Sequence, residues 1–208
     1  MKKFELTAEF VTNVFGKKLF RIKALVAFGN VEKGELGGFI EKEGNLSNDG
    51  NAWVYGNARV YGNARVSGDA WVYGNARVSG NAWVSGNACV SGNACVSGNA
   101  CVYGNAWVYS DAWVYGNAWV SGNARVSGNA DYAVVKGFGR YFRATTFFRC
   151  KDKILRVQCG CFYGDLAEFR EVVKKTHGDS KYAKEYLAIA DLMELHFSDE
   201  EGRQEATE

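Results

Sequence analysis

The sequence predicts a mainly β protein built around a regular coil of short strands, and three observations support this fold class. Thirteen valines, from Val54 to Val126, recur at every sixth position without interruption. The phrase around each is nearly constant: Gly, Asn or Asp, Ala, a variable residue, Val, and then Tyr or Ser. Such a fixed short period is typical of repeat architectures. A helix would need a 3.6-residue period, and the Gly in nearly every unit would cost about 1 kcal/mol there.

Within one unit, the alternation of side chains separates inside from outside. Because successive side chains of a strand point to opposite faces, an inward Val72 places Tyr73 and Arg77 outside. The Gly-Asn pair between them suits a corner, since both residue types tolerate a positive φ. Ala76 is small enough to lie inside, just past that corner. Two inward apolar positions in six residues predict a narrow solenoid.

These repeats, over residues 51–131, resemble the hexapeptide-repeat family of left-handed parallel β-helix proteins. The resemblance implies three hexapeptides per triangular coil, so that the thirteen units make a little over four coils. The left-handed sense is also an implication of the resemblance. With a strand spacing of about 4.8 Å, the prism would stand roughly 20 Å tall.

Positions eighteen residues apart stack on one outer face, and all six tryptophans fall at outward positions. The first face is the richest in aromatic residues: Trp53, Tyr55, Trp71, Tyr73, Trp107 and Tyr109. Large exposed apolar patches usually mark interfaces. Three interpretations stay open. The face packs against another copy in a dimer or trimer, the chain's own terminal segments cover it, or it binds a ligand or partner protein.

The two segments that flank the coil are predicted to close its ends, because an open end exposes strand edges and core. Residues 1–50 read as a β-rich cap with extended segments at 2–11 and 17–28. Its phrase from Gly29 to Ile40, followed by Asn-Leu-Ser, resembles the start of a group of hexapeptide-repeat proteins often encoded in prophages. Asn30 departs from the Asp frequently seen in that group.

Residues 132–197 are predicted to form a ββαα module, similar to the C-terminal module of the same group. The segments 145–150 and 154–162 read as a hairpin. Asp165 with Glu168 forms a capping-box variant at the start of a helix that ends at Gly178, and Ser180 caps a second helix. Residues 198–208 are acidic and are expected to fray.

Charge is divided within this C-terminal region. Residues 132–158 carry seven basic and one acidic side chains, net +6, whereas residues 159–208 carry six basic and twelve acidic ones, net −6. Two interpretations remain: solvated faces that attract each other, or an anion site for a nucleotide or nucleic acid. The candidate anion-binding residues are Arg140, Arg143, Arg149, Lys151 and Arg156. Because the whole chain has a net charge of only +2, nucleic acid is not the expected partner.

Metal and cofactor sites are not predicted. One cysteine stands on each face of the coil at the same height, and the three point away from each other: Cys89, Cys95 and Cys101. Cys159 and Cys161, with Cys150 and His177, could in principle hold zinc. Their spacing is not a standard ligand motif, so we expect packing residues instead.

An enzyme is likewise not the primary prediction. The resemblance implies that acyltransferases on this scaffold use a histidine as general base and that its carbonic anhydrases bind zinc with three, whereas this coil contains no histidine. No catalytic residue is therefore predicted. The enzymatic alternative is an atypical acyltransferase with His177 or His196 as base.

The sequence thus predicts a non-catalytic, oligomeric β-helical binding scaffold, encoded by a phage or prophage. One concrete hypothesis is a counter-defence protein that binds a host immune protein or a signalling nucleotide. A structural or virion assembly component is the third possibility. The lack of an apolar N-terminal run and of a membrane span, together with six cysteines, predicts the cytoplasm of a bacterial host.

Overall fold

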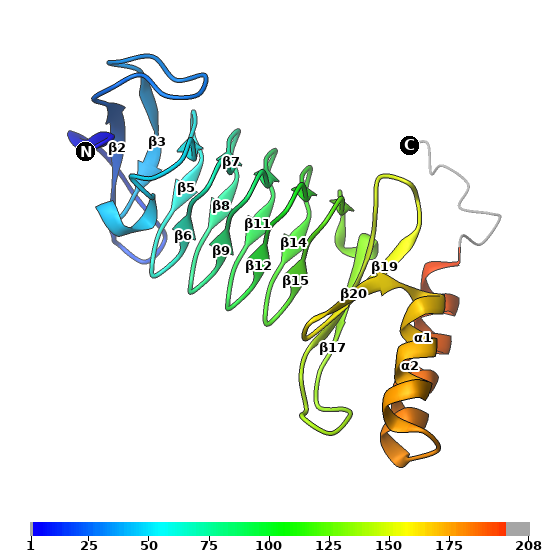
Figure 1. Ribbon diagram of the computed structural model, residues 1–208. Helices are drawn as coiled ribbons and strands as arrows, with labels where there is room; N and C mark the ends of the chain where they lie inside the picture. The colour runs from blue at the N-terminus through cyan, green and yellow to red at the C-terminus, as the bar shows by residue number, and fades with distance from the viewer. Residues whose placement is uncertain (1, 199–208) are drawn as a thin grey trace, which may run out of the picture.

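A computed structural model of the chain describes residues 2–198 and contains a central β-solenoid between two terminal segments (Figure 1). The solenoid consists of thirteen two-residue strands, each ending in a repeat valine. Their bounds are β4 Trp53–Val54, β5 Arg59–Val60, β6 Arg65–Val66, β7 Trp71–Val72, β8 Arg77–Val78, β9 Trp83–Val84, β10 Cys89–Val90, β11 Cys95–Val96, β12 Cys101–Val102, β13 Trp107–Val108, β14 Trp113–Val114, β15 Trp119–Val120 and β16 Arg125–Val126. The predicted mainly β fold with a repeat solenoid is confirmed.

The strands form three parallel ladders, which are the three faces of the solenoid. The first face is β4-β7-β10-β13-β16, the second contains β5-β8-β11-β14, and the third is β6-β9-β12-β15. Within each ladder, neighbouring strands are eighteen residues apart, so that Val54 pairs with Val72 and Val72 with Val90. The left-handed sense stays a prediction from the resemblance.

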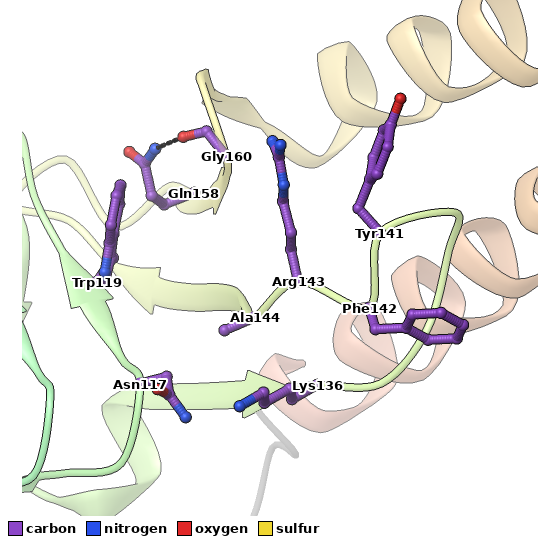
Figure 2. A pocket seen from close by; sticks show the side chains of 9 residues that line it. All are labelled: Asn117, Trp119, Lys136, Tyr141, Phe142, Arg143, Ala144, Gln158 and Gly160. Atoms are coloured by element: carbon purple, nitrogen blue, oxygen red, sulfur yellow. Dashed lines mark hydrogen bonds between the residues drawn. The ribbon is translucent and has the colours of Figure 1, made fainter.

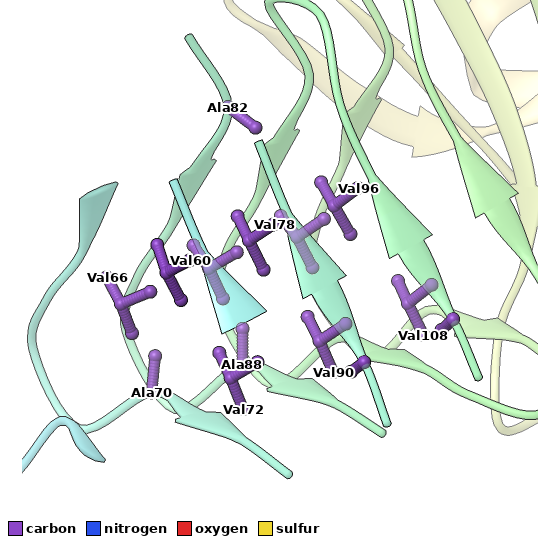
Figure 3. Packing of buried hydrophobic residues seen from close by; sticks show 14 of the residues in the cluster. Val60, Val66, Ala70, Val72, Val78, Ala82, Ala88, Val90, Val96 and Val108 are labelled. Carbon is purple, nitrogen blue, oxygen red and sulfur yellow. The ribbon is translucent and has the colours of Figure 1, made fainter. Parts of the chain in front are cut away.

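The core of the solenoid contains the repeat valines and alanines, which are buried at every level. Figure 3 shows Val60, Val78 and Val96 in one stacked row and Val72, Val90 and Val108 in another. Full burial of a valine contributes about 1.5 kcal/mol or more. The inward positions predicted by alternation are therefore the ones that stabilise the coil.

The corners are formed by the Gly-Asn pairs. Gly74 has a φ of 71°, and a Cβ there would lie 3.1 Å from the backbone nitrogen of Gly92 in the next turn. Asparagine side chains bond from turn to turn; Asn81 Nδ2, for example, donates to Asn99 Oδ1 at 3.0 Å. Ser110 adopts the same positive φ, 56°, in the one unit that lacks the glycine.

The lead-in segment adds a level to the solenoid, which the valine pattern did not predict. β3 (Leu36–Ile40) pairs in parallel with β5, so that Ile40 takes a valine position beside Val60. Leu46 does the same beside Val66 on the third face. Each face therefore has five levels, whereas the thirteen repeat units predicted a little over four coils. The additional level forms because other apolar residues occupy the valine positions at this end.

The N-terminal end of the core is covered by an antiparallel hairpin. β1 (Phe4–Thr12) pairs with β2 (Lys18–Ala24), and β2 pairs with β3, which extends the second face to seven strands. A short 3-10 helix, η1 (Glu43–Asn45), follows β3. Phe4, Ile22 and Leu46 pack in the same cluster as the repeat valines.

Lys3 is buried at this end of the solenoid, and it should make the free energy of unfolding depend on pH in the alkaline range. Its Nζ donates to the carbonyl of Ala52 at 2.9 Å, and burial lowers its pKa from 10.5 to about 8. Below pH 8 the lysine is charged in both states and its burial destabilises the fold. Between pH 8 and 10.5 the unfolded chain holds the proton more tightly than the folded one, so stability rises with pH.

We expect the free energy of unfolding of the wild type to rise across this window, relative to Lys3→Met, by on the order of 3 kcal/mol at most. Urea unfolding of both proteins at several pH values measures the difference. Parallel pH profiles would show that Lys3 does not titrate in this way.

The C-terminal module contains a four-stranded antiparallel meander and two helices. Its elements are η2 Asn129–Asp131, β17 Tyr132–Val135, β18 Thr145–Arg149, β19 Leu155–Cys159, β20 Phe162–Asp165, α1 Leu166–His177 and α2 Lys181–Phe197. The expected β18–β19 hairpin and both helices are present, but β17 and β20 add an outer strand on each side, so the ββαα description is incomplete. β20 is a separate strand because the chain reverses at Gly160, which has a φ of 60°.

The module covers the second end of the solenoid. The valine core extends into the module through Tyr132, Phe148 and Cys150. The backbone of Cys150 also forms an antiparallel β-bridge with Ala124 of the last turn. The backbone N–H of Lys151 donates to the carbonyl of Asn123 at 3.0 Å. No helix within residues 2–198 is long and apolar enough to cross a membrane. Apart from Ser198, the predicted acidic tail lies outside the described residues.

Candidate functional site

A cavity of about 380 Å³ opens between the third face of the solenoid and the C-terminal module. We call it the C-terminal pocket. It is lined by Asn117, Trp119, Lys136, Tyr141, Phe142, Arg143, Ala144, Gln158 and Gly160. Figure 2 shows Trp119 and Gln158 on one side of the space and Arg143 with Tyr141 on the other. Three segments far apart in the chain therefore contribute to one site.

The solenoid wall of the pocket is the indole of Trp119. The alternation of β15 directs Val120 into the core and Trp119 outward, where it remains 44% exposed. Its backbone N–H donates to Thr146 Oγ1 at 2.9 Å, and its ring meets the edge of Tyr103 with centroids 6.4 Å apart. Trp119 is thus held in place while much of its ring stays accessible.

Gln158 connects the module to the third face beneath the pocket. Its buried Oε1 accepts hydrogen bonds from Tyr103 and Ser121, both at 3.1 Å, and its Nε2 donates to the carbonyl of Gly160 at 2.8 Å. A buried amide with its bonds satisfied on both sides fixes the relative position of two elements. Gln158 therefore holds β19 firmly against the third face of the solenoid at this point.

The opposite wall is the 136–144 loop between β17 and β18. The N–H of Gly139 donates to Glu185 Oε2 at 2.8 Å, which attaches the loop to α2. Phe142 adopts a φ of 51°, a costly conformation for a bulky residue that often accompanies functional loops. The guanidinium of Arg143 lies 5.0 Å from the Tyr141 ring centroid.

The electrostatics of the pocket favour an anion. Within residues 2–198, Lys136, Arg140 and Arg143 form no ion pair with a carboxylate. Burial raises the pKa of the nearby Tyr186 to about 12, with Arg143 acting in the opposite direction, so this phenol is neutral at neutral pH. None of the nine lining residues carries negative charge.

The five predicted anion-binding residues do not form one site. Arg140 and Arg143 lie on the 136–144 loop, whereas Arg149, Lys151 and Arg156 lie toward the opposite end of the β18–β19 hairpin. Arg156 pairs with Asp152 at 2.9 Å, and Arg149 donates to the carbonyl of Phe197 at 3.0 Å. These basic residues are close in sequence but lie apart in the structure, because β18 separates the 136–144 loop from Arg149 and Lys151.

The predicted aromatic face is also divided. Trp53 is fully buried, because Phe4 and Phe28 contact it edge-on with centroids 6.3 and 5.4 Å away. It points out of the coil, as predicted, but the N-terminal segment covers it. Along the rest of the face Tyr55, Trp71 and Tyr109 are half-buried, whereas Tyr73 and Trp107 are exposed. The guanidinium of Arg125 lies 4.5 Å from the Trp107 ring centroid.

None of the histidines or cysteines of the module is among the residues that line the C-terminal pocket, although Cys159 and Cys161 stand on either side of Gly160 in the chain. His177 stacks on Tyr186 with centroids 5.9 Å apart, and His196 contacts Phe197 at the end of α2. In the part of the chain that the structure describes, no three His, Cys, Asp or Glu side chains gather in a group that could hold a metal ion.

Of the pocket residues, only Arg143 belongs to the predicted sites. One further feature of the sequence could have indicated this pocket: aromatic and arginine residues are interleaved in the run from Phe138 to Arg143. Such a run is compatible with an ordinary surface loop. Its position beside Trp119 follows from the fold.

Comparison with known families gives a match to the solenoid alone. Residues 52–68, 58–74 and 70–86 match the family described as YdcK Beta solenoid repeat. A search of curated proteins found no significant match. The matched repeats and the observed ladders together establish the chain as a β-solenoid, or β-helix, repeat protein.

Proposed function

We propose that this protein is a non-catalytic binding scaffold that holds a nucleotide in the C-terminal pocket. The observation that carries the proposal is the half-exposed indole of Trp119 opposite cations that have no carboxylate partner within the described residues. A nucleotide has the matching chemistry, a flat aromatic base joined to a phosphate.

Each part of the ligand has a counterpart in the pocket. Stacking of a base on an aromatic side chain contributes about 1–3 kcal/mol and tolerates any base. Arg143 can bond a phosphate in a bidentate manner, and Lys136 adds a second positive charge. The amide of Asn117 can bond the base edge. The lining contains no carboxylate, histidine, cysteine or serine, which favours retention of the ligand over its conversion.

The biological role that we propose is sequestration of a signalling nucleotide by a phage- or prophage-encoded protein in the cytoplasm of its bacterial host. The resemblance of the lead-in and the module to a prophage-associated group motivates this role. A binder without turnover would lower the free concentration of a defence signal in proportion to its own abundance.

Self-association accompanies this proposal. On the first face the indole of Trp107 is 45% exposed, and the ring of Tyr73 beside the same row is 36% exposed. Exposed aromatic rings of this kind favour contact with another copy, so we propose a homodimer or homotrimer. This contact would leave Trp119 free on the third face.

Isothermal titration of purified protein with a panel of mononucleotides, AMP included, tests the pocket. We expect Trp119→Ala and Arg143→Gln each to weaken binding about tenfold or more, since each removes a main contact. Trp113→Ala, which alters an exposed indole in the same turn but on the second face, is the matched control and should bind normally. Equal affinities for all four proteins, or no binding by the wild type, would refute the proposal.

A further inference from the structure

The third face has a second hollow at its N-terminal end, which we call the N-terminal hollow. Its volume is about 370 Å³, and it is lined by Glu43, Gly44, Leu46, Ser47, Asn48, Arg65, Val66, Ser67 and Trp83. One wall is the 43–48 segment after β3, and the floor is formed by β6 and β9. This end of the face therefore repeats the arrangement of the C-terminal pocket, a solenoid floor beside a terminal segment.

The N-terminal hollow also repeats the chemistry of the C-terminal pocket. Trp83 is 52% exposed, and its Nε1 donates to Ser67 Oγ at 2.9 Å, which fixes the indole. Arg65 is the in-register neighbour of Trp83 and has no carboxylate ion pair within residues 2–198. Glu43, the one acidic residue in the lining, binds Lys2 at 2.7 Å. An aromatic platform again stands beside an available guanidinium.

The two hollows lie along a single row of side chains. Strand pairing places Arg65, Trp83, Cys101 and Trp119 in register on β6, β9, β12 and β15. Figure 1 shows these four strands side by side between the N-terminal segment and β17. Two strand spacings separate Trp83 from Trp119, about 10 Å. Cys101 between them is small, and burial raises the pKa of its thiol, so it contributes no negative charge.

We infer that the third face is one elongated groove for two nucleotides joined by a phosphodiester. One base stacks on Trp83 and the other on Trp119, while Arg143 binds the linking phosphodiester, which is the 5′-phosphate of the nucleotide on Trp119, and Arg65 binds the terminal 5′-phosphate. The inference rests on the proposed function for the Trp119 half. The second face has only one tryptophan, Trp113, and cannot supply two such platforms.

The ligand class has two sources, a free dinucleotide and a stretch of a longer single strand. Both present bases on a phosphodiester backbone, the chemistry that stacking platforms in a cationic groove recognise. The spacing of the tryptophans favours the dinucleotide, since the row contains two tryptophans and ends at terminal segments on both sides.

Titration with AMP, with the linear dinucleotide pApA and with a longer oligoadenylate tests the groove. For the wild type we expect pApA to bind about tenfold or more tightly than AMP, because a second base stacks. Trp83→Ala and Arg65→Gln should lower pApA affinity to the level of AMP, whereas Trp119→Ala should weaken both ligands. Trp113→Ala and Arg77→Gln, on the second face, are the matched controls.

The outcomes separate the two proposals. If AMP binding depends on Trp119 but pApA binds no more tightly, the groove is refuted and the pocket stands. If neither AMP nor pApA binds, both fail. If Trp83→Ala and Trp113→Ala behave alike towards pApA, the groove is refuted. With the groove supported, equal affinity for pApA and the oligoadenylate identifies a free dinucleotide, and tighter binding of the oligoadenylate identifies a single strand.

Discussion

Replacement of Trp53 by alanine is expected to lower the free energy of unfolding by about 4 kcal/mol, the largest effect of any single aromatic truncation on the solenoid. Trp53 is 0% exposed and belongs to the main core, where Phe4 and Phe28 contact its ring edge-on. Loss of the indole would leave a cavity where the N-terminal hairpin covers the first turn. The neighbouring backbone, held by parallel ladders, can collapse only in part.

Urea unfolding monitored by circular dichroism measures this effect. The matched control is Trp113→Ala, which removes an indole that is 58% exposed and should change stability by about 0.5 kcal/mol or less. Trp53→Phe should cost far less than Trp53→Ala, because it keeps most of the ring and removes a buried N–H that has no partner in the structure. A Trp53→Ala protein as stable as Trp113→Ala would show that the N-terminal segment does not cover this residue.

Gly38→Ala should destabilise the protein by about 3 kcal/mol through steric overlap where β3 meets the first turn. A Cβ on Gly38 would lie 2.7 Å from the carbonyl oxygen of Ala58 and 2.7 Å from Val54 Cγ1. Neither atom can move freely, since one is backbone and the other is a core side chain. The Gly-Gly pair of the lead-in is thus explained by close approach of two backbones.

Gly44→Ala is the control for this substitution, because no atom lies within 4 Å of the position that the added methyl group would take, and the φ of Gly44 is not in the left-handed region. It should leave the free energy of unfolding within about 0.5 kcal/mol of the wild type. Comparable urea midpoints for the two variants would mean that β3 packs less tightly on the first turn than the structure indicates.

The solenoid could be predicted from the sequence because its determinants are local and repeated. Alternation decides that Val72 is inside and Tyr73 outside, and the Gly-Asn corner meets a φ requirement of the residues themselves. Thirteen copies of one phrase reinforce the same inference. The extra level of the solenoid was missed because Ile40 and Leu46 each occur once, and a single apolar residue has no period.

The exposure of the outward side chains could not be predicted from the local sequence. Trp53, Trp83 and Trp119 occupy equivalent outward positions in their units, yet one is buried and two remain exposed. The difference arises because the N-terminal hairpin folds over the first turn of the first face. Alternation specifies the direction of a side chain relative to its own strand and carries no information about segments that return from elsewhere.

The sequence by itself therefore determined the β-solenoid, its inward residues and the presence of different segments at both ends. Only the tertiary structure decided which aromatic residues are covered, that Arg149 and Arg156 bond within the module, and that Arg143 meets Trp119 across the C-terminal pocket. The physical reason is sequence separation. The solenoid repeats contacts at a fixed interval, whereas the pocket joins residues 117–119, 136–144 and 158–160 through packing of the module on the last turns.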